Sequence, residues 1–413
     1  MKNFKTIRMR AATAGLVVAV FGTSACGKFL DVSNPGLIED EALNGASFAP
    51  AIVAGISADY SRALDPGIAQ FASVMAYEIT SGLSDQGEHV IGYLDSDIVD
   101  RQGTWDVWQR SRWVASAGVV RLQESLGAAF GTSVYAAKAN LYAGLANRLL
   151  GENACKAVLD GGSVQPREVF FSTGEGYFTE AIKIATAAGD SDVKHAALGG
   201  RASVRAWQGN WSGAVEDAKL VPGSFMFQAK YSAGGVNLRM YEEQFTSRYL
   251  TMQGSKWLDV TDDPRVPWSK THLHDSDGVA PPTRGGGWRT WPQMKYMTRD
   301  SDVPVTHGAE MLVLRAEAAL RDGDIAGMTS LLNESRALPK WGMDPIAQPA
   351  TTAEAWEVMK FERRATLWLE HRGFWDLARW NAEGKDTLLE GRAKCFPIGQ
   401  KEIDSNPNLE SLR

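Results

Sequence analysis

The sequence predicts a mainly α-helical protein with a tetratricopeptide-like helical repeat scaffold, long loop insertions and little β structure. Three observations support this fold class. Apolar residues recur at helical spacing over most of the chain from Ala46 onward. A helix, turn, helix pattern occurs twice in matching form, and one long glycine- and proline-rich segment interrupts the helices. Paired helices of this kind bury a shared face only by stacking on their neighbours.

The chain begins with the pattern of an export signal. Residues 1–10 carry four cations, residues 11–21 form an apolar run too short to span a bilayer, and small residues precede Cys26. We therefore expect residues 1–25 to be a lipoprotein signal peptide, with Cys26 lipidated after cleavage. Ordinary periplasmic secretion with an incidental cysteine is the alternative, because Thr23 stands where lipoprotein signals usually carry leucine.

Residues 26–45 form a short lipidated tether in this interpretation, and residues 46–413 form one α-helical domain. No apolar run after the signal approaches the roughly 20 residues that a membrane-spanning helix needs. The composition is ordinary for a globular protein, with 44% hydrophobic and 22% charged residues. The formal net charge of −6 argues against nucleic acid or another polyanion as a partner.

A strongly periodic helix is predicted over Thr104–Glu124. Its large apolar residues are Trp105, Trp108, Val119 and Leu122, which recur at helical spacing. A tryptophan stripe of this kind is typical of a packed core, since an indole ring offers a broad apolar surface with a single donor. We therefore expect these side chains to be buried.

The repeat aligns residues 201–211 without gaps on residues 315–325. The shared turn positions are Gly209 and Gly323, each followed by a polar residue, Asn210 or Asp324. The glycines can take the left-handed conformation that ends the first helix of a pair, and the polar side chains can cap the second helix. Further helix pairs are expected at residues 134–159 and 352–380.

Residues 222–304 break the helical pattern. This segment contains Gly234-Gly235, Pro281-Pro282 and the run Gly285-Gly286-Gly287. We interpret it as a long loop excursion inserted into the scaffold rather than as part of the scaffold. Loops of this length inside a compact domain are uncommon unless they serve a function.

Two further cysteines, Cys155 and Cys395, form an even pair in a chain that we expect to be exported. An oxidising compartment permits a disulfide between them. The alternative is two separate buried thiols that behave as small hydrophobic side chains. The sequence leaves both arrangements open.

The segment at residues 362–380 alternates charged residues with large apolar ones. The charged residues are Arg363, Glu370, Arg372, Asp376 and Arg379, and the tryptophans are Trp368, Trp375 and Trp380. We expect an ion-pair network that joins two helices, with the tryptophans packed beneath it. A glycosidase would instead use Glu370 and Asp376 as its two carboxylates. The nearby guanidinium groups argue against this, because they lower a carboxyl pKa and a general acid needs a raised one.

Other catalytic and metal-binding patterns receive little support. The sequence contains no Gly-x-Ser-x-Gly, phosphate-loop, His-Glu-x-x-His or Cys-x-x-Cys motif. His272 and His274 lie beside Asp275 and Asp277, but in a glycine- and proline-rich loop a solvated polar turn is favoured over a metal site. We therefore predict no enzymatic activity, no cofactor and no metal site.

Three segments occur in a recognisable order along the chain. Lys-Phe-Leu-Asp-Val-Ser-Asn-Pro follows the cysteine at residues 28–35, the charged tryptophan-rich segment covers residues 362–380, and Cys-Phe-Pro-Ile-Gly begins the segment at residues 395–409. Together they resemble the SusD/RagB family of outer-membrane nutrient-binding lipoproteins. The resemblance implies a lipid-anchored scaffold, exposed at the cell surface, that covers a SusC-like TonB-dependent transporter. It also implies a non-catalytic role and a glycan, oligosaccharide or sometimes peptide ligand.

Sugar binding needs aromatic planes for the apolar faces of pyranose rings and polar groups for their hydroxyls. Loops present such groups, so we expect the ligand surface in residues 84–97 and in the excursion at residues 222–304. The candidate ligand-binding residues are His89, Tyr93, Trp268, Arg284, Trp288 and Trp291. For Trp291, which precedes Pro292, packing of the loop onto the scaffold is the favoured interpretation.

The predicted function is non-catalytic binding of a glycan or oligosaccharide nutrient and its delivery to a SusC-like transporter. A different class of function is a tetratricopeptide-like protein- or peptide-binding assembly lipoprotein without a glycan site. An exported glycosidase is a third hypothesis, which requires a carboxylate pair in a cleft. The sequence leaves open the identity of the glycan and the face of the outer membrane on which the protein lies.

Overall fold

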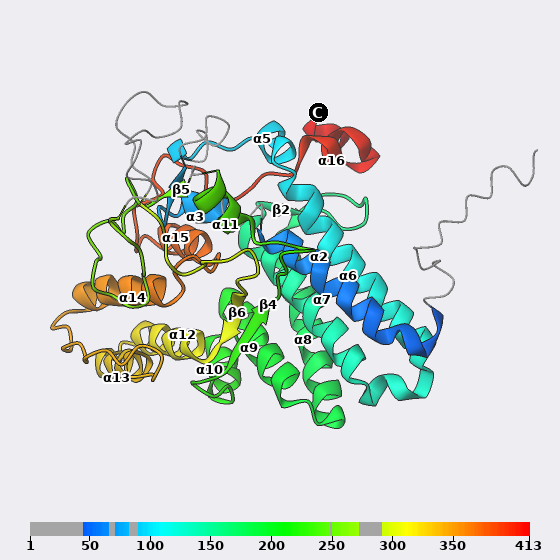
Figure 1. Ribbon diagram of the computed structural model, residues 1–413, viewed down its shortest axis with the longest axis horizontal. Coiled ribbons are helices and arrows are strands. Elements are labelled where there is room, and N and C mark those ends of the chain that lie inside the picture. The colour runs from blue at the N-terminus through cyan, green and yellow to red at the C-terminus, as the bar shows by residue number, and fades with distance from the viewer. Residues whose placement is uncertain (1–43, 66–70, 82–89, 248–249, 272–290) are drawn as a thin grey trace, which may run out of the picture. The chain divides into compact units, whose positions relative to one another are not determined.

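The structure is a computed structural model that describes residues 44–65, 71–81, 90–247, 250–271 and 291–413. Helices dominate these residues, and the strands among them form only short antiparallel pairs. The mainly α-helical fold class predicted from the sequence is therefore confirmed (Figure 1). None of the helices in these ranges combines the length and the apolar character that a membrane crossing demands.

A layer of long helices packed in sequence order makes up the first half of the fold. They are α2 (Ala49–Leu64), α6 (Thr104–Leu126), α7 (Val134–Asn153), α8 (Glu168–Ala188) and α9 (Ser191–Trp207). Each helix packs against the next one in this order, as Figure 1 shows for α2, α6, α7 and α8. A Cβ atom on Gly144 of α7 would lie 2.7 Å from the Phe178 ring of α8, so this glycine permits the close approach of the two helices.

The helix predicted at residues 104–124 is α6. Trp105, Trp108 and Leu122 are buried in the main core, and Val119 packs against it at the edge. The Trp108 ring meets the Phe396 ring edge-on, with ring centroids 5.1 Å apart. The tryptophan stripe is therefore core, as predicted, and the C-terminal segment helps to cover it.

The predicted repeat is present as two helix pairs. The first is α9 with α10 (Trp211–Lys219), and the second is α12 (Gly308–Arg321) with α13 (Ile325–Arg336). Each pair turns at a glycine with a φ of 82°, and the residue after it caps the second helix by accepting a backbone hydrogen bond from three residues further on. These residues are Gly209 and Asn210 in the first pair and Gly323 and Asp324 in the second. The turn chemistry predicted from the sequence is confirmed.

The two pairs are joined into one stack. Helix α10 packs against α12, and α12 packs against α14 (Thr352–Thr366). The pair expected at residues 352–380 consists of α14 and α15 (Gly373–Ala382). The pair expected at residues 134–159 is wrong: no glycine-centred turn interrupts α7, which fills residues 134–153 alone and pairs with α8 instead.

The excursion at residues 222–304 leaves the scaffold and returns to it at one place. Its first strand, β4 (Met226–Ala229), pairs antiparallel with β6 (Val303–His307), where the excursion ends. Between them, β5 (Leu250–Thr251) pairs with β1 (Thr80–Ser81), and one helical segment consists of α11 (Arg239–Tyr241) and η6 (Glu242–Thr246). The described part of the excursion is therefore a loop region held to the scaffold by short strands.

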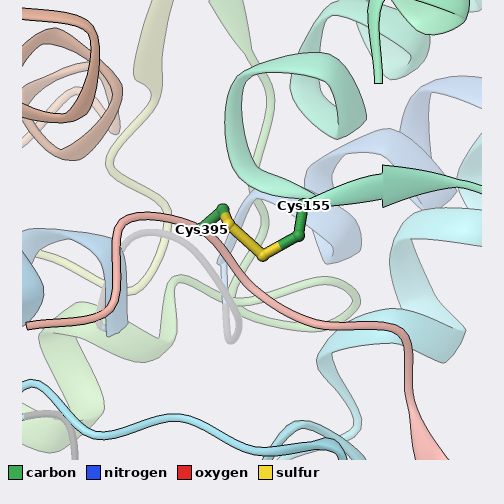
Figure 2. Close-up of a disulfide and its surroundings, with 2 residues drawn as sticks. All are labelled: Cys155 and Cys395. Atoms are coloured by element: carbon green, nitrogen blue, oxygen red, sulfur yellow. A yellow bond between two sulfur atoms is a disulfide. The ribbon is translucent and has the colours of Figure 1, made fainter. Parts of the chain in front are cut away.

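A disulfide joins Cys155, just after α7, to Cys395 near the C-terminus (Figure 2). Backbone hydrogen bonds flank it on both sides: the Cys155 N–H donates to the Phe396 carbonyl, and the Phe396 N–H donates to the Asn153 carbonyl, each at 2.8 Å. The sequence left open a disulfide or two separate buried thiols, and the structure contains the disulfide. It closes a loop with a sequence separation of 240 residues, so it fixes the C-terminal segment against the helical layer.

The remaining elements are short. They are η2 (Ala46–Phe48), α3 (Phe71–Met75), α5 (Ser96–Arg101), η5 (Gly127–Thr132), β2 (Lys156–Ala157) paired with β3 (Gln165–Pro166), α16 (Gln400–Ser405) and η7 (Pro407–Leu412). Helices α5 and α16 pack together, which brings the early loop region and the C-terminal segment to the same side of the domain (Figure 1).

Candidate functional site

Trp268 and Trp291, two of the aromatic residues predicted to bind ligand, stack on each other. Their ring centroids are 5.9 Å apart and the ring planes differ by 29°. The indole Nε1–H of Trp268 donates to the Val260 carbonyl at 2.6 Å, and the backbone N–H of Trp291 donates to the Thr251 hydroxyl at 3.1 Å. Both rings are half-buried and pack against the main core. Trp291 therefore supports the loop, and Trp268 keeps part of its ring at the surface, where the Lys270 ammonium lies 5.6 Å from its centroid.

Tyr93 is exposed, with 55% of its surface accessible, and lies just before α5. A hydrogen bond to Asp95 raises the pKa of its hydroxyl. None of the ring contacts or hydrogen bonds of the described residues joins Tyr93 to the Trp268 and Trp291 pair. The other predicted ligand residues, His89, Arg284 and Trp288, lie outside the described residues, as does Cys26.

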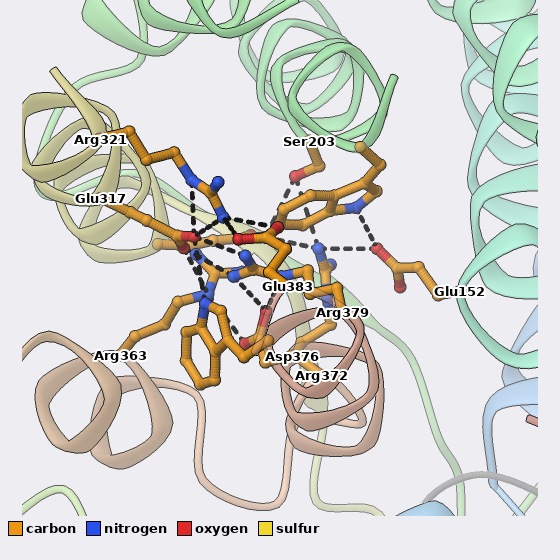
Figure 3. Close-up of polar contacts among 12 residues, drawn as sticks. Glu152, Ser203, Glu317, Arg321, Arg363, Arg372, Asp376, Arg379 and Glu383 are labelled. Atoms are coloured by element: carbon orange, nitrogen blue, oxygen red, sulfur yellow. Dashed lines mark hydrogen bonds and ion pairs between the residues drawn. The ribbon is translucent and has the colours of Figure 1, made fainter. Parts of the chain in front are cut away.

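The C-terminal charged residues form the buried ion-pair network that the sequence predicts (Figure 3). The Arg379 guanidinium of α15 bonds to Asp376 at 2.8 Å on its own helix and to Glu317 of α12 at 2.6 Å. The Arg363 Nε of α14 donates to Asp376 at 2.8 Å. The Trp380 Nε1–H also donates to Glu317, at 3.2 Å. Arg321 of α12 also pairs with Glu317, at 2.8 Å, so these two carboxylates are shared between cations from three helices.

A second group of ion pairs extends this network toward the first helices of the domain. Arg372 lies 3.0 Å from Glu152 of α7 and 2.9 Å from Glu310 of α12. Glu370 accepts a hydrogen bond from Lys295 at 2.7 Å and lies 2.8 Å from the His307 Nε2. Five of these six residues are buried, and Lys295 is the exception. The segment at residues 370–379 thus contacts both the helical layer and the end of the excursion.

Sequence reasoning identified the charged residues of this network within residues 362–380 but not the partners that other segments supply. The missed partners are Glu152, Lys295, His307, Glu310 and Glu317. Glu310 and Glu317 are seven residues apart in α12, so they share one of its faces. A pair of carboxylates on a buried helical face is a signal that cations cover it.

The network does not suit acid catalysis. Burial alone would raise the pKa of Glu317 and of Glu370. The neighbouring cations nevertheless hold the pKa of Glu317 far below its ordinary value and lower the pKa of Glu370 to about 2. A general acid needs the opposite shift. Carboxyls with a raised pKa do occur, since burial raises the pKa of Asp65 and of Glu78 to about 7. Both are buried, and each accepts a backbone hydrogen bond, from Arg239 and Leu369 respectively, so they hold loops in place.

A metal site is not evident in the part of the chain that the structure describes, where no group of three or more histidine, cysteine, aspartate or glutamate side chains is placed to hold an ion. His272 and His274, which the sequence analysis weighed as ligands, lie outside this part. The arrangement that remains is a polar, aromatic loop surface on a scaffold closed by ion pairs and a disulfide.

Residues 288–394 match the family model described as the SusD family. Among solved structures, a SusD-like carbohydrate-binding protein from Bacteroides fragilis is 14% identical, with 89% of this chain and 99% of that chain aligned at a TM-score of 0.65. A SusD superfamily protein from Bacteroides thetaiotaomicron is 16% identical, with 88% and 97% aligned at a TM-score of 0.65. A laminarin-binding SusD-like protein is 14% identical, with 88% and 99% aligned at a TM-score of 0.57. Comparison with curated protein sequences finds no match.

These comparisons confirm the resemblance to the SusD/RagB family that the sequence analysis described. The family model covers the end of the excursion, the second helix pair and the network on α14 and α15. The solved structures, at identities of 14–16%, show that the fold of the chain is SusD-like. The helical scaffold expected from the resemblance is therefore present.

We expect Glu317→Ala to destabilise the protein by about 3–5 kcal/mol, because Arg379 would lose one of its two buried carboxylate partners. Glu383→Ala is the matched control. Glu317 and Glu383 both pair with Arg321, but the side chain of Glu383 is one-third exposed. Removal of Glu383 should therefore cost no more than about 1 kcal/mol of unfolding free energy. Denaturant unfolding of both variants measures the difference. Equal losses in the two variants would contradict the structural importance of the network.

Proposed function

We propose that this chain is a non-catalytic, SusD-like outer-membrane lipoprotein that binds a glycan or oligosaccharide nutrient and delivers it to a SusC-like TonB-dependent transporter. The observation that carries the proposal is the SusD-like fold over 88–89% of the chain, combined with the SusD family match at residues 288–394. Two proteins of this fold are described as carbohydrate-binding and laminarin-binding. The buried, ion-paired carboxylates support binding without hydrolysis.

The proposed glycan surface is formed by the loops at residues 84–97 and by the excursion. The Trp268 ring is the centre of this surface, since Trp291 stacks against it and the Lys270 ammonium lies near it. Tyr93 contributes an exposed ring, and His89, Arg284 and Trp288 are further candidates. Rings fixed by packing bind sugar faces at little conformational cost.

The alternative function, peptide or protein binding by tetratricopeptide-like repeats without a glycan site, is favoured by one observation. The pairs α9 with α10 and α12 with α13 have the turn geometry and stacking of such repeats. Screening the purified protein against glycan and peptide arrays separates the two functions. Binding to peptides alone would favour the alternative.

Tyr93→Ala and Trp268→Ala should each weaken binding of the best glycan by about tenfold, which corresponds to loss of roughly 1.4 kcal/mol of ring contact. Trp113→Ala is the control, because Trp113 is equally exposed, at 59%, but lies on α6. Calorimetric titration measures the affinities, and an assay for released reducing sugar runs on the same samples. Unchanged affinity in both loop variants would refute this surface, and released sugar would refute the non-catalytic role.

We also propose that residues 1–25 are removed and that acyl chains on Cys26 anchor the protein, as the cationic start, the short apolar run and the cysteine suggest. A labelled fatty acid should be incorporated into the wild-type protein and not into Cys26→Ser. The Cys26→Ser protein should keep its glycan affinity, because Cys26 is not one of the candidate ligand-binding residues. Label that persists in the variant would contradict the anchor.

A further inference from the structure

A cleft of about 530 Å³ lies on the scaffold, and its lining includes neither Tyr93 nor Trp268 of the proposed glycan surface. It is formed where the ends of α9 and α12, the starts of α8 and α10, and one side of α15 come together. The residues that carry the argument are Arg167, Trp207, Trp211, Arg321, Trp375 and Lys394. Its volume is in the range of small-molecule sites.

Three tryptophan rings from three helices form the apolar part of this cleft. The Trp207 ring lies 6.3 Å from Trp211 at an interplanar angle of 80°, and 6.0 Å from Trp375 at 69°. Trp207 is fixed, because its Nε1–H donates to Glu152 at 2.9 Å and the Arg379 guanidinium lies 4.6 Å from its ring centroid. The ion-pair network therefore holds Trp207, and the Arg321 guanidinium lies 4.4 Å from the Trp211 ring centroid.

Cations outnumber carboxylates in the cleft lining. Arg167, Arg321, Arg379 and Lys394 line it, against Glu168 and Glu383. Arg321 pairs with Glu317 and Glu383, and Arg379 pairs with Glu317 and Asp376, so these two arginines are neutralised by neighbouring carboxylates. Arg167 and Lys394 have no ion pair among the described residues, and Glu168 is the one lining carboxylate left beside them, so the cleft keeps a small excess of positive charge.

Two donors at the cleft lack acceptors in the described part of the chain. The Arg167 Nη1 and the Trp375 Nε1 are both buried without a hydrogen-bond partner, although the Arg167 guanidinium lies only 5.4 Å from the Trp375 ring centroid. Trp375 is 9% exposed, and burial lowers the pKa of Arg167. Buried donors of this kind are costly unless a ligand or water supplies oxygen atoms.

We infer that this cleft binds a carboxylate-bearing sugar unit, such as a hexuronate, within an otherwise neutral saccharide. A carboxylate supplies two acceptor oxygens for a guanidinium, and a pyranose ring supplies the C–H face that an indole packs against. The net charge of −6 disfavours a long polyanion but not a single carboxylate held beside Arg167. An acidic peptide fits less well, because side chains of helices line the cleft and no strand edge is there to pair with a peptide backbone.

The test compares two disaccharides on the purified full chain. The acidic probe is an aldobiouronic acid, in which glucuronate is linked to xylose, and the neutral probe is xylobiose. Quenching of tryptophan fluorescence, checked by calorimetry, should show the acidic probe binding at least tenfold more tightly. Arg167→Gln should remove this preference, and Arg167→Lys should retain part of it because the charge remains. Trp375→Phe, which keeps a ring but removes the N–H, should weaken binding several-fold.

Lys219→Gln is the control, because it removes an exposed cation from the end of α10 opposite to Trp211, outside the cleft lining, and should leave the affinity unchanged. The inference fails if the two probes bind equally, if Arg167→Gln has no effect, or if a short acidic peptide binds where the acidic sugar does not. It is independent of the proposed glycan surface: loss of neutral glycan binding in Tyr93→Ala reports on that surface, and loss of acidic-sugar binding in Arg167→Gln reports on the cleft.

Discussion

The bond between Arg379 and Glu317 is the interaction on which the rest of this structure depends. Both groups are buried, and burying charges is expensive unless every partner is present. Here Asp376 completes the pair, Arg363 shares Asp376, and Arg321 shares Glu317. In the observed packing of helices α12, α14 and α15, each of these charges has a partner of opposite sign.

This arrangement determines where the rest of the C-terminal segment lies. Arg372 follows α14 and reaches Glu152 on α7, so the second half of the chain is held against the first layer of helices. The disulfide fixes the same segment covalently, next to the end of α7. Glu370 in turn holds Lys295 and His307, at the end of the excursion. A rigid scaffold of this kind leaves ligand binding to side chains that its loops and helix ends present.

The local features of this fold are readable from the sequence. The turns at Gly209 and Gly323 follow from two residue types with known conformational roles, and the α6 helix follows from its apolar spacing. Long-range features are not readable, because they depend on segments that meet only after folding. The cations of the network were visible, but Glu152 lies 220 residues away from Arg372, so that nothing in either local pattern indicates the pairing. The cleft was missed for the same reason, since Trp207 and Trp375 are neighbours only in space.

The dependence of the unfolding free energy on acidic pH tests the central claim that these buried carboxyls are charged and stabilise the fold. The pKa of Glu370 is about 2 in the folded chain and about 4.3 in an unfolded one. Its ionised form should therefore contribute about 3 kcal/mol above about pH 4.5, and this contribution should be lost as the pH falls toward 2. Unfolding free energies of wild type and Glu370→Gln, measured from pH 7 to pH 2, should differ most above about pH 4.5 and approach each other as the pH falls from there to 2. A constant difference, or convergence already near pH 6, would contradict the account.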